Sequence, residues 1–256
     1  MKHERAMERR AFLKGTVGVA SLVALAGCDN LTLSSWFPNI LNKTERLTDL
    51  VQRAMTPTNA LAKEYSDTEI SKVFPANGNT DPGTQDYAEM AQNNFADWHV
   101  MIHGLVTIPM TCSLAAIKEM PARTQITRHD CVEGWSAIGK WTGVPLGDLM
   151  RKIQPLPNAR YAVFHCADLD DDGVPYYESM ALADCYHPQT ILAYELNGRP
   201  LDVPHGAPLR LRFERQLGYK HAKYVVRIEL VESLQGIGGG RGGYWEDQGY
   251  EWYAGI

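Results

Sequence analysis

The sequence predicts an α+β protein with a β-rich core, in which a mixed or barrel-like sheet is accompanied by short helices. Runs that alternate apolar and polar residues, the period of a β-strand, outnumber runs with helical spacing. The two kinds of run are interspersed without the regular strand–helix alternation of a parallel α/β sheet. A chain of 256 residues suits one large domain, or one domain with extensions.

The strand predictions follow from alternation, from continuous apolar runs and from turn signals. The run WHVMIHGLV alternates and ends near Gly104, whereas ARYAVFHCA is apolar enough for a buried strand. Asn197-Gly198 favours a two-residue turn, so the run around it predicts a hairpin. The predicted strands lie in 98–106, 123–131, 159–167, 189–201, 208–213 and 223–231.

Helical spacing is confined to a few short segments. Residues 113–120 predict a helix that Pro121 ends, and 145–153 predict a second one. Nearer the N-terminus, one helical face is apolar and Asn42 with Glu45 forms a plausible N-terminal capping pair. The residues of that face are Leu47, Leu50, Val51, Ala54 and Met55.

Residues 1–28 have the order of a signal peptide, with basic residues, an apolar run and a small-residue end. Arg9-Arg10 resembles a twin-arginine signal, and the apolar run is too short to span a bilayer comfortably. LAGC resembles a lipobox with Cys28 as the lipidated residue; a plain cleavage site is the alternative. The expected protein is therefore exported to the periplasm, with a lipid on Cys28 as its membrane tether.

The predicted organisation has three parts. The signal occupies 1–28, an N-terminal extension with one helix occupies 29–85, and the main domain occupies 86–256. Because the twin-arginine route exports folded proteins, it raises the expectation of a cofactor bound before export.

Charge and cysteine spacing exclude several functions. The first 27 residues hold five Lys/Arg and two Asp/Glu, so 20 basic and 28 acidic residues remain, a net charge of −8. A chain with this net negative charge has no sign of the basic surface that binds nucleic acid. The sequence contains no CxxCH for covalent haem and no CxxC pair for structural zinc.

A lone cysteine in the polar stretch TRHDCVEGWSAIGKW is the principal candidate for chemistry. Cys131 follows a predicted strand and precedes a turn. From the residues alone it could be a buried structural thiol, a nucleophile activated by Arg128 and His129, or a ligand for a soft metal.

The segment CVEGWSAIGKWTGVPLGDLM, residues 131–150, resembles the molybdenum-ligand segment of the sulfite oxidase family of molybdopterin enzymes. It is most similar to the branch that contains the periplasmic protein-methionine-sulfoxide reductase subunit. CVEGWS, LAYELNG, HGAPLR and GYKHAK occur in the family's order and spacing, and the similarity covers about residues 90–235.

The resemblance implies a sulfite-oxidase-type molybdopterin-binding fold and one molybdenum-molybdopterin cofactor with a single pterin. Cys131 matches the cysteine that binds molybdenum in the family. Tyr176 matches a tyrosine beside the metal, which would donate a hydrogen bond to an oxygen ligand or to the substrate; Tyr177 is the competing candidate. The residues that match the family's cofactor contacts are Asn93, Cys131, Cys166, His205, Arg210, His221, Ala222 and Lys223.

The implied reaction is oxygen-atom transfer coupled to two electrons, with a small oxyanion, sulfoxide or N-oxide as substrate. Gln92 stands where sulfite oxidases have a sulfite-binding arginine, which argues against sulfite. Electrons would pass to or from a separate cytochrome or membrane haem protein. The alternatives are a sulfite dehydrogenase and a non-catalytic exported binding module. The aromatic-rich segment 242–256 could close over the pocket, face a partner or pack on the domain.

Overall fold

The structure is a computed structural model that describes residues 59–256. The twin-arginine signal, the lipidation site Cys28 and the helix expected near residues 42–55 lie outside the described residues, so they stay predictions. Within residues 59–256, no helix combines the length and the apolar character that crossing a membrane requires.

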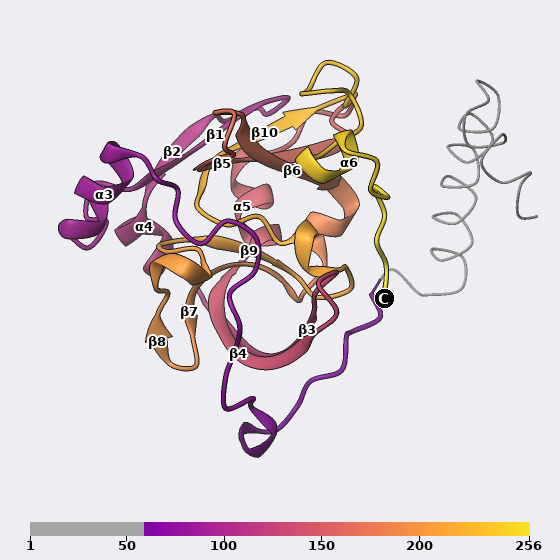
Figure 1. The fold of residues 1–256 in the computed structure, drawn as a ribbon. Coiled ribbons are helices and arrows are strands. Elements are labelled where there is room, and N and C mark those ends of the chain that lie inside the picture. The colour runs from indigo at the N-terminus through magenta and orange to yellow at the C-terminus, as the bar shows by residue number, and fades with distance from the viewer. Residues whose placement is uncertain (1–58) are drawn as a thin grey trace, which may run out of the picture. The chain divides into compact units, whose positions relative to one another are not determined.

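One of the two sheets has five strands in the order β2-β1-β10-β5-β6 (Figure 1). β1 and β10 run parallel, and the other neighbours are antiparallel. The strands are β1 (His99–Gly104), β2 (Met110–Ser113), β5 (Tyr161–Leu169), β6 (Pro175–Ala181) and β10 (Val225–Val231).

The other sheet is antiparallel throughout, with the order β3-β4-β7-β8 and with β9 also paired to β7. β3 and β4 pair over their whole length, so the residues that lead into the Cys131 turn are fixed in register. The strands are β3 (Arg123–Asp130), β4 (Ser136–Pro145), β7 (Thr190–Leu196), β8 (Arg199–Pro200) and β9 (Arg210–Phe213).

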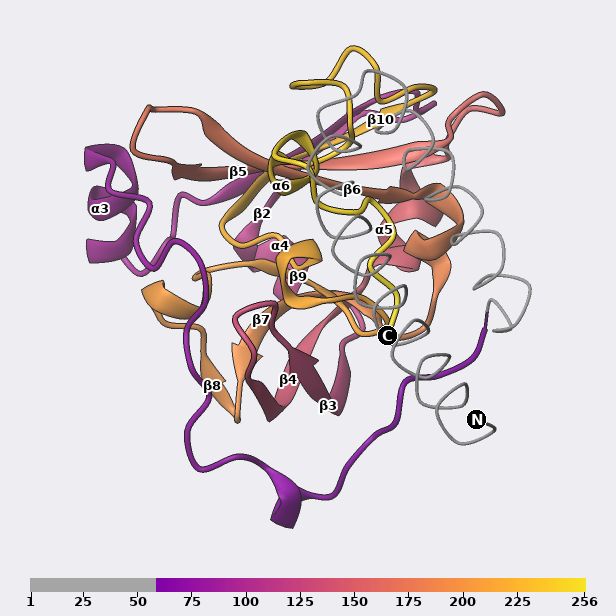
Figure 2. The same cartoon turned by 45° about the vertical axis from the view of Figure 1, so that its right-hand side comes forward.

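Helix α5 (Leu146–Ile153) lies between the two sheets and supplies much of the core (Figures 1 and 2). Leu146, Leu149, Met150 and Ile153 are fully buried, because their spacing puts them on one helical face. The other helices are short. They are α3 (Gln85–Gln92), α4 (Leu114–Lys118), α6 (Tyr244–Asp247) and the 3₁₀ turns η1 (Asp67–Glu69), η2 (Leu182–Tyr186), η3 (Val203–His205) and η4 (Gly218–Lys220).

The segment before α3 runs along the outside of the second sheet, as the purple trace in Figure 1 shows. Glu64 forms a β-bridge with Thr127 of β3, and the amide of Ser71 donates to the carbonyl of Ile138 in β4, 3.0 Å away. Further along, residues 77–84 reach the cavity described below. Part of the predicted extension is therefore packed on the sheet that positions Cys131.

The predicted α+β class with a β-rich core is confirmed. The predicted strands are present, and Asn197-Gly198 forms the β7–β8 turn, but the sequence did not indicate β2, β4, β6, α3 or α6. β4 contains Gly139 and Gly143, which weaken a strand pattern. Gly143 is required because a Cβ there would lie 2.2 Å from the carbonyl oxygen of Leu192 in the neighbouring strand. β6 begins with a proline and buries Glu178, so the usual alternation is lost.

Candidate active site

A cavity of about 720 Å³ lies next to Cys131. Its walls come from segments far apart in the sequence, so only the folded chain assembles it. The lining residues fall in 77–84, 131–133, 168–176, 218–223 and 244–250.

Cys131 stands in the turn that joins β3 to β4. Its amide donates to the carbonyl of Trp135 at 2.9 Å, and its own carbonyl accepts from the amide of Gly134 at 3.0 Å. Gly134 has φ +89°, a conformation that favours glycine. The side chain is 8% exposed and lines the cavity. Burial raises the pKa of the thiol above its usual value, which weakens the reading of Cys131 as a self-activated nucleophile.

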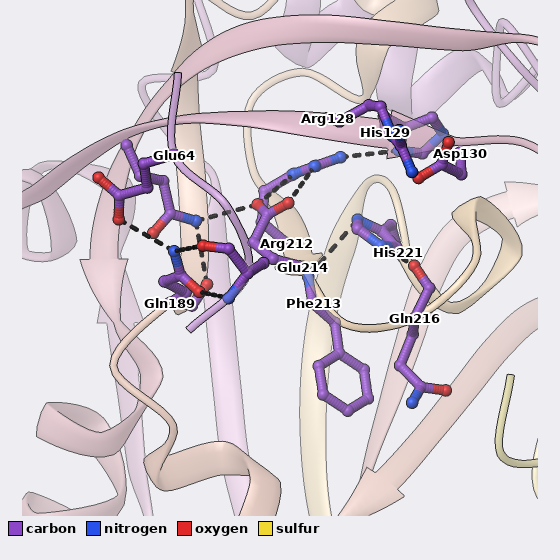
Figure 3. Close-up of polar contacts among 12 residues, drawn as sticks. Glu64, Arg128, His129, Asp130, Gln189, Arg212, Phe213, Glu214, Gln216 and His221 are labelled. Atoms are coloured by element: carbon purple, nitrogen blue, oxygen red, sulfur yellow. Dashed lines mark hydrogen bonds and ion pairs between the residues drawn. The ribbon is translucent and has the colours of Figure 1, made fainter. Parts of the chain in front are cut away.

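A buried polar network supports the strand that ends at Cys131 (Figure 3). Arg212 of β9 donates twice to the Glu214 carboxylate, at 2.6 and 2.9 Å, and once to Nδ1 of His129 at 2.8 Å. Because that nitrogen accepts, His129 carries its proton on Nε2. Gly218 makes room for this ring, since a Cβ there would lie 2.5 Å from Nε2. The network thereby connects the end of β3, just before Cys131, to β9, and the ring of His129 packs against Gly218, which lines the cavity.

His221 lines the cavity as a neutral imidazole. Its Nδ1 faces the amide of Phe213 at 3.5 Å, and its Nε2 donates to the carbonyl of Gln216 at 3.0 Å. Burial, with Arg212 and His129 nearby, holds the pKa of His221 well below its usual value. His221 therefore presents an uncharged ring whose two nitrogens already contact the backbone.

This neutral histidine makes stability depend on pH. Because its folded pKa is depressed, only the unfolded chain takes up this proton below about pH 6.5, so the stability contribution is lost as pH falls. We expect wild type to lose about 1 kcal/mol more than His221→Gln per pH unit below pH 6. Urea unfolding at pH 7.5 and 5.5 measures this. Equal slopes in wild type and His221→Gln would contradict the prediction.

Two buried cations lie near one another beside the cavity. Lys223 Nζ donates to the carbonyls of Asn77 at 2.8 Å, Pro204 at 3.1 Å and Asn79. Burial, followed by repulsion from Arg210, lowers the pKa of Lys223 to about 7. Burial, followed by repulsion from Arg212, lowers the pKa of Arg210 to about 9.

Arg210 donates from Nη1 to the carbonyl of His205 at 2.9 Å. Among residues 59–256, its Nε and Nη2 are buried without a hydrogen-bond partner. The contacts of Lys223 are to uncharged carbonyls. An anionic group such as a phosphate beside the two cations would satisfy the open donors and raise both lowered pKa values.

Tyr176 lines the cavity, and its hydroxyl donates to the carbonyl of Tyr219 at 2.6 Å. Burial, with Glu178 nearby, raises the pKa of Tyr176 well above its usual value, so the phenol is a hydrogen-bond donor rather than a base. Tyr177 lies outside the lining residues and hydrogen-bonds Asp247. The geometry thus favours Tyr176 over Tyr177.

The predicted site residues divide into two groups. Cys131, Tyr176, His221 and Lys223 line one cavity. The others are Asn93, Cys166, His205, Arg210 and Ala222, which are absent from the lining. Asn93 is exposed and donates to Asp97 at 2.8 Å. His205 places its ring nitrogens 2.5 Å from Asp202 and 2.9 Å from the carbonyl of Phe74.

Cys166 and Ala222 are both buried, at 5% and 1% exposure. The Cys166 thiol lies 4.0 Å from the carbonyl of Phe164, and burial raises its pKa well above the usual value. The four cysteines of the described part, Cys112, Cys131, Cys166 and Cys185, are free thiols.

Sequence reasoning missed Asp168 and the 77–84 loop. Asp168 lines the cavity at 4% exposure, and burial raises its pKa to about 6. Within the described residues its Oδ1 is buried without a hydrogen-bond partner. It ends a buried strand in DLDDDG, whose run of carboxylates resembles a solvated turn. The aromatic C-terminal segment was recognised as a candidate cover, and Tyr244, Trp245 and Tyr250 do line the cavity.

A family match that includes three of the five segments lining the cavity decides the family. The model for the oxidoreductase molybdopterin binding domain matches residues 87–236, more than half of the chain. The chain belongs to the oxidoreductase molybdopterin-binding domain family. It is therefore a molybdenum-dependent oxidoreductase whose cofactor is molybdenum-molybdopterin, as the resemblance predicted. The lone thiol on the cavity wall, the buried ammonium of Lys223 and the open donors of neighbouring Arg210 fit such a group.

Two curated relatives and one solved structure are similar to this chain. The putative protein-methionine-sulfoxide reductase subunit YedZ1 of Azospira oryzae is 35% identical over 247 residues, which cover 96% of this chain and 87% of the relative. The protein-methionine-sulfoxide reductase catalytic subunit MsrP of Xanthomonas campestris is 38% identical over 147 residues, covering 54% of this chain and 46% of MsrP. The sulfane dehydrogenase SoxCD structure from Paracoccus pantotrophus aligns with TM-score 0.49 and 22% identity, covering 54% of this chain and 39% of that one.

Proposed function

We propose that this family member reduces a small sulfoxide or N-oxide, with Cys131 as the protein ligand of molybdenum. The observation that supports this most directly is a lone buried thiol on the wall of a 720 Å³ cavity that also holds Lys223 and Tyr176. Within residues 59–256, no three His, Cys, Asp or Glu side chains converge on a metal site. A single thiolate, joined by the sulfurs of the pterin, therefore suits the donor set.

We propose that residues on and near strands β9 and β10 hold the pterin. Lys223 and Arg210 would hold its phosphate, because both have lowered pKa values and Arg210 has open donors. Asn93, Cys166, His205, His221 and Ala222 complete the set implied by the family resemblance. When bound, the cofactor supplies a metal that exchanges an oxygen atom and two electrons with the substrate.

In the proposed reaction the S–O or N–O bond breaks and the sulfur or nitrogen gains two electrons. The oxygen leaves as water after taking up two protons. Tyr176 is proposed to donate a hydrogen bond to the substrate oxygen, after giving up its bond to the Tyr219 carbonyl. The electrons come from a separate redox protein, for which a cytochrome or membrane haem protein is the proposed partner.

The proposed place of action is the periplasm, reached by the twin-arginine route, with lipid on Cys28 as the membrane tether. The names of the relatives, which include "subunit" and "catalytic subunit", support an assembly with a second protein. A mass shift on Cys28 in the mature protein, measured by mass spectrometry of the N-terminal peptide, tests the tether.

Molybdenum content tests the proposal first. Plasma mass spectrometry should find about one molybdenum per wild-type chain. X-ray absorption should count one sulfur ligand fewer on the molybdenum of Cys131→Ser, because a hydroxyl is a poor soft-metal ligand. Cys112→Ser, which changes a buried thiol outside the cavity, should keep its metal. An unchanged number of sulfur ligands on the molybdenum of Cys131→Ser would contradict the assigned ligand.

A dye-linked assay over S- and N-oxides then tests the reaction. Reduced viologen should be oxidised by at least one such oxide in metal-loaded wild type. Fast sulfite oxidation with no oxide reduced would replace the proposal by sulfite dehydrogenase. Wild type that takes up no metal under full cofactor supply would instead favour the non-catalytic binding module.

A further inference from the structure

Five aromatic side chains form a continuous wall of the cavity. Successive ring centroids lie 5.2–5.6 Å apart in the order Tyr176, Tyr244, Trp245, Tyr250, Tyr219. All five are lining residues. We call this set the aromatic wall. Three of its members come from the α6 region near the C-terminus, and the other two come from β6 and η4.

Protein acceptors already hold several hydroxyl groups of the aromatic wall. Tyr176 donates to the Tyr219 carbonyl at 2.6 Å, and Tyr219 donates to the Glu251 carbonyl at 2.6 Å. Tyr244 donates to Asp170 at 2.7 Å. Tyr176 is the residue whose hydroxyl the proposed reaction uses; because the Tyr219 and Tyr244 hydroxyls are engaged, those residues offer a ligand their rings rather than their hydroxyls. The negative face of an aromatic ring attracts cations and the positive ends of dipoles.

The charges around the cavity also favour cationic ligands over anionic ones. The lining includes five carboxyl groups, those of Asp81, Glu133, Asp168, Asp170 and Asp171. Among the lining residues that the structure describes, Lys223 is the one lysine or arginine. The proposed phosphate of the cofactor would use that charge. An anionic substrate would therefore enter against net negative charge.

We propose that the aromatic wall selects oxides with a methylated, positively charged end and rejects anionic oxides. This inference rests on the proposed reduction of S- and N-oxides. In such oxides the S–O or N–O dipole leaves positive charge on the sulfur or nitrogen and its methyl groups. With that end against the rings, the oxygen is the end left to face the metal. A nearby ammonium group on the substrate strengthens the same contacts, whereas a carboxylate or sulfonate weakens them.

Matched substrates test this selection in metal-loaded wild type. Three methyl sulfoxides of equal length would end in a trimethylammonium, a tert-butyl or a carboxylate group, with reduced viologen as electron donor. We expect kcat/KM to be about tenfold higher for the cation than for the carboxylate, with the neutral compound between them. The difference should lie in KM rather than in kcat. Equal values, or a preference for the carboxylate, would overturn the inference.

Substitutions in the aromatic wall test whether these rings cause the preference. In Tyr250→Leu and Trp245→Leu, kcat/KM for the cationic sulfoxide divided by kcat/KM for the neutral one should fall towards one. Tyr250 is 41% exposed, so its replacement should leave the fold intact. Tyr186→Leu is the matched control, because Tyr186 is also 41% exposed and lies outside the lining. An unchanged ratio in both cavity variants would overturn the assignment to the wall.

A binding measurement separates this inference from the proposed reaction. Saturation-transfer NMR on the metal-loaded protein should show the methyl protons of tetramethylammonium, and a weaker signal in Tyr250→Leu. Methanesulfonate at the same concentration should give little signal. If no oxide is reduced but tetramethylammonium binds in this way, the reaction fails and the wall's preference stands. If oxides are reduced while methanesulfonate binds equally well, the reaction stands and the wall's preference fails.

Discussion

Replacing Lys220 with methionine should lower the free energy of unfolding by about 3–5 kcal/mol. The side chain is 1% exposed, and its ammonium donates to both Glu178 and Glu246, which are equally buried. Without that charge, two carboxyl groups face each other away from water. Burial and the neighbouring Glu246 already raise the pKa of Glu178 well above its usual value. The variant would have to keep both carboxyls protonated or let water into this part of the core.

Urea unfolding at pH 7 measures the effect, with Lys72→Met, an exposed lysine, as the control. Glu178→Gln added to Lys220→Met should restore part of the loss by removing one charge. Glu178→Gln alone tests the titration. Because the folded pKa of Glu178 is raised, wild type loses stability relative to this variant as pH rises above 4.5 towards the folded pKa. A Lys220→Met variant within about 1 kcal/mol of wild type would refute the structural role.

Replacing Arg212 with methionine should cost a similar amount, about 3–5 kcal/mol. The guanidinium is fully buried, makes two bonds to Glu214 and lies 4.3 Å from the Trp141 ring centroid. Its removal leaves the Glu214 carboxylate buried, with Gln125 as a remaining donor at 2.9 Å. His129 would also lose the donor that fixes its tautomer.

The unfolding midpoint of Arg212→Met should be compared with that of Arg151→Met. Arg151 pairs with Asp148 on the exposed side of α5, so its loss should cost at most about 0.5–1 kcal/mol. Similar costs for the two variants would show that the buried network contributes no more than a surface pair. A metal content that falls in Arg212→Met at a temperature where the protein is still folded would connect the network to the Cys131 turn.

Local sequence patterns were sufficient for the class of fold and for α5. The pattern in 145–153 predicts this helix, and Asn197-Gly198 predicts its turn. β4 and β6 were not predictable in this way. Their glycines, proline and buried glutamate are acceptable only because particular neighbours accommodate them, such as the Leu192 backbone and Lys220.

The site was predictable where one residue type carries the chemistry. Cys131 stands out as a lone thiol in polar surroundings, and the structure places it on a cavity wall. The aromatic wall and Asp168 depend on contacts between distant segments, which no local pattern encodes. Asn93 and His205, assigned by resemblance, are engaged with Asp97 and Asp202 instead of lining the cavity, so their contacts with cofactor stay predictions.

The assembly of the cavity from five distant segments also has a consequence for the timing of synthesis. Residues 244–250 leave the ribosome after the other four segments that line the cavity. Contacts between such distant segments form late in folding. Until they dock, the emerging domain has its sheets but lacks one side of the cavity. We expect a bulky ligand to reach the cavity more easily before these residues dock than after. Slow translation of the last codons would lengthen this interval, and rapid translation would shorten it.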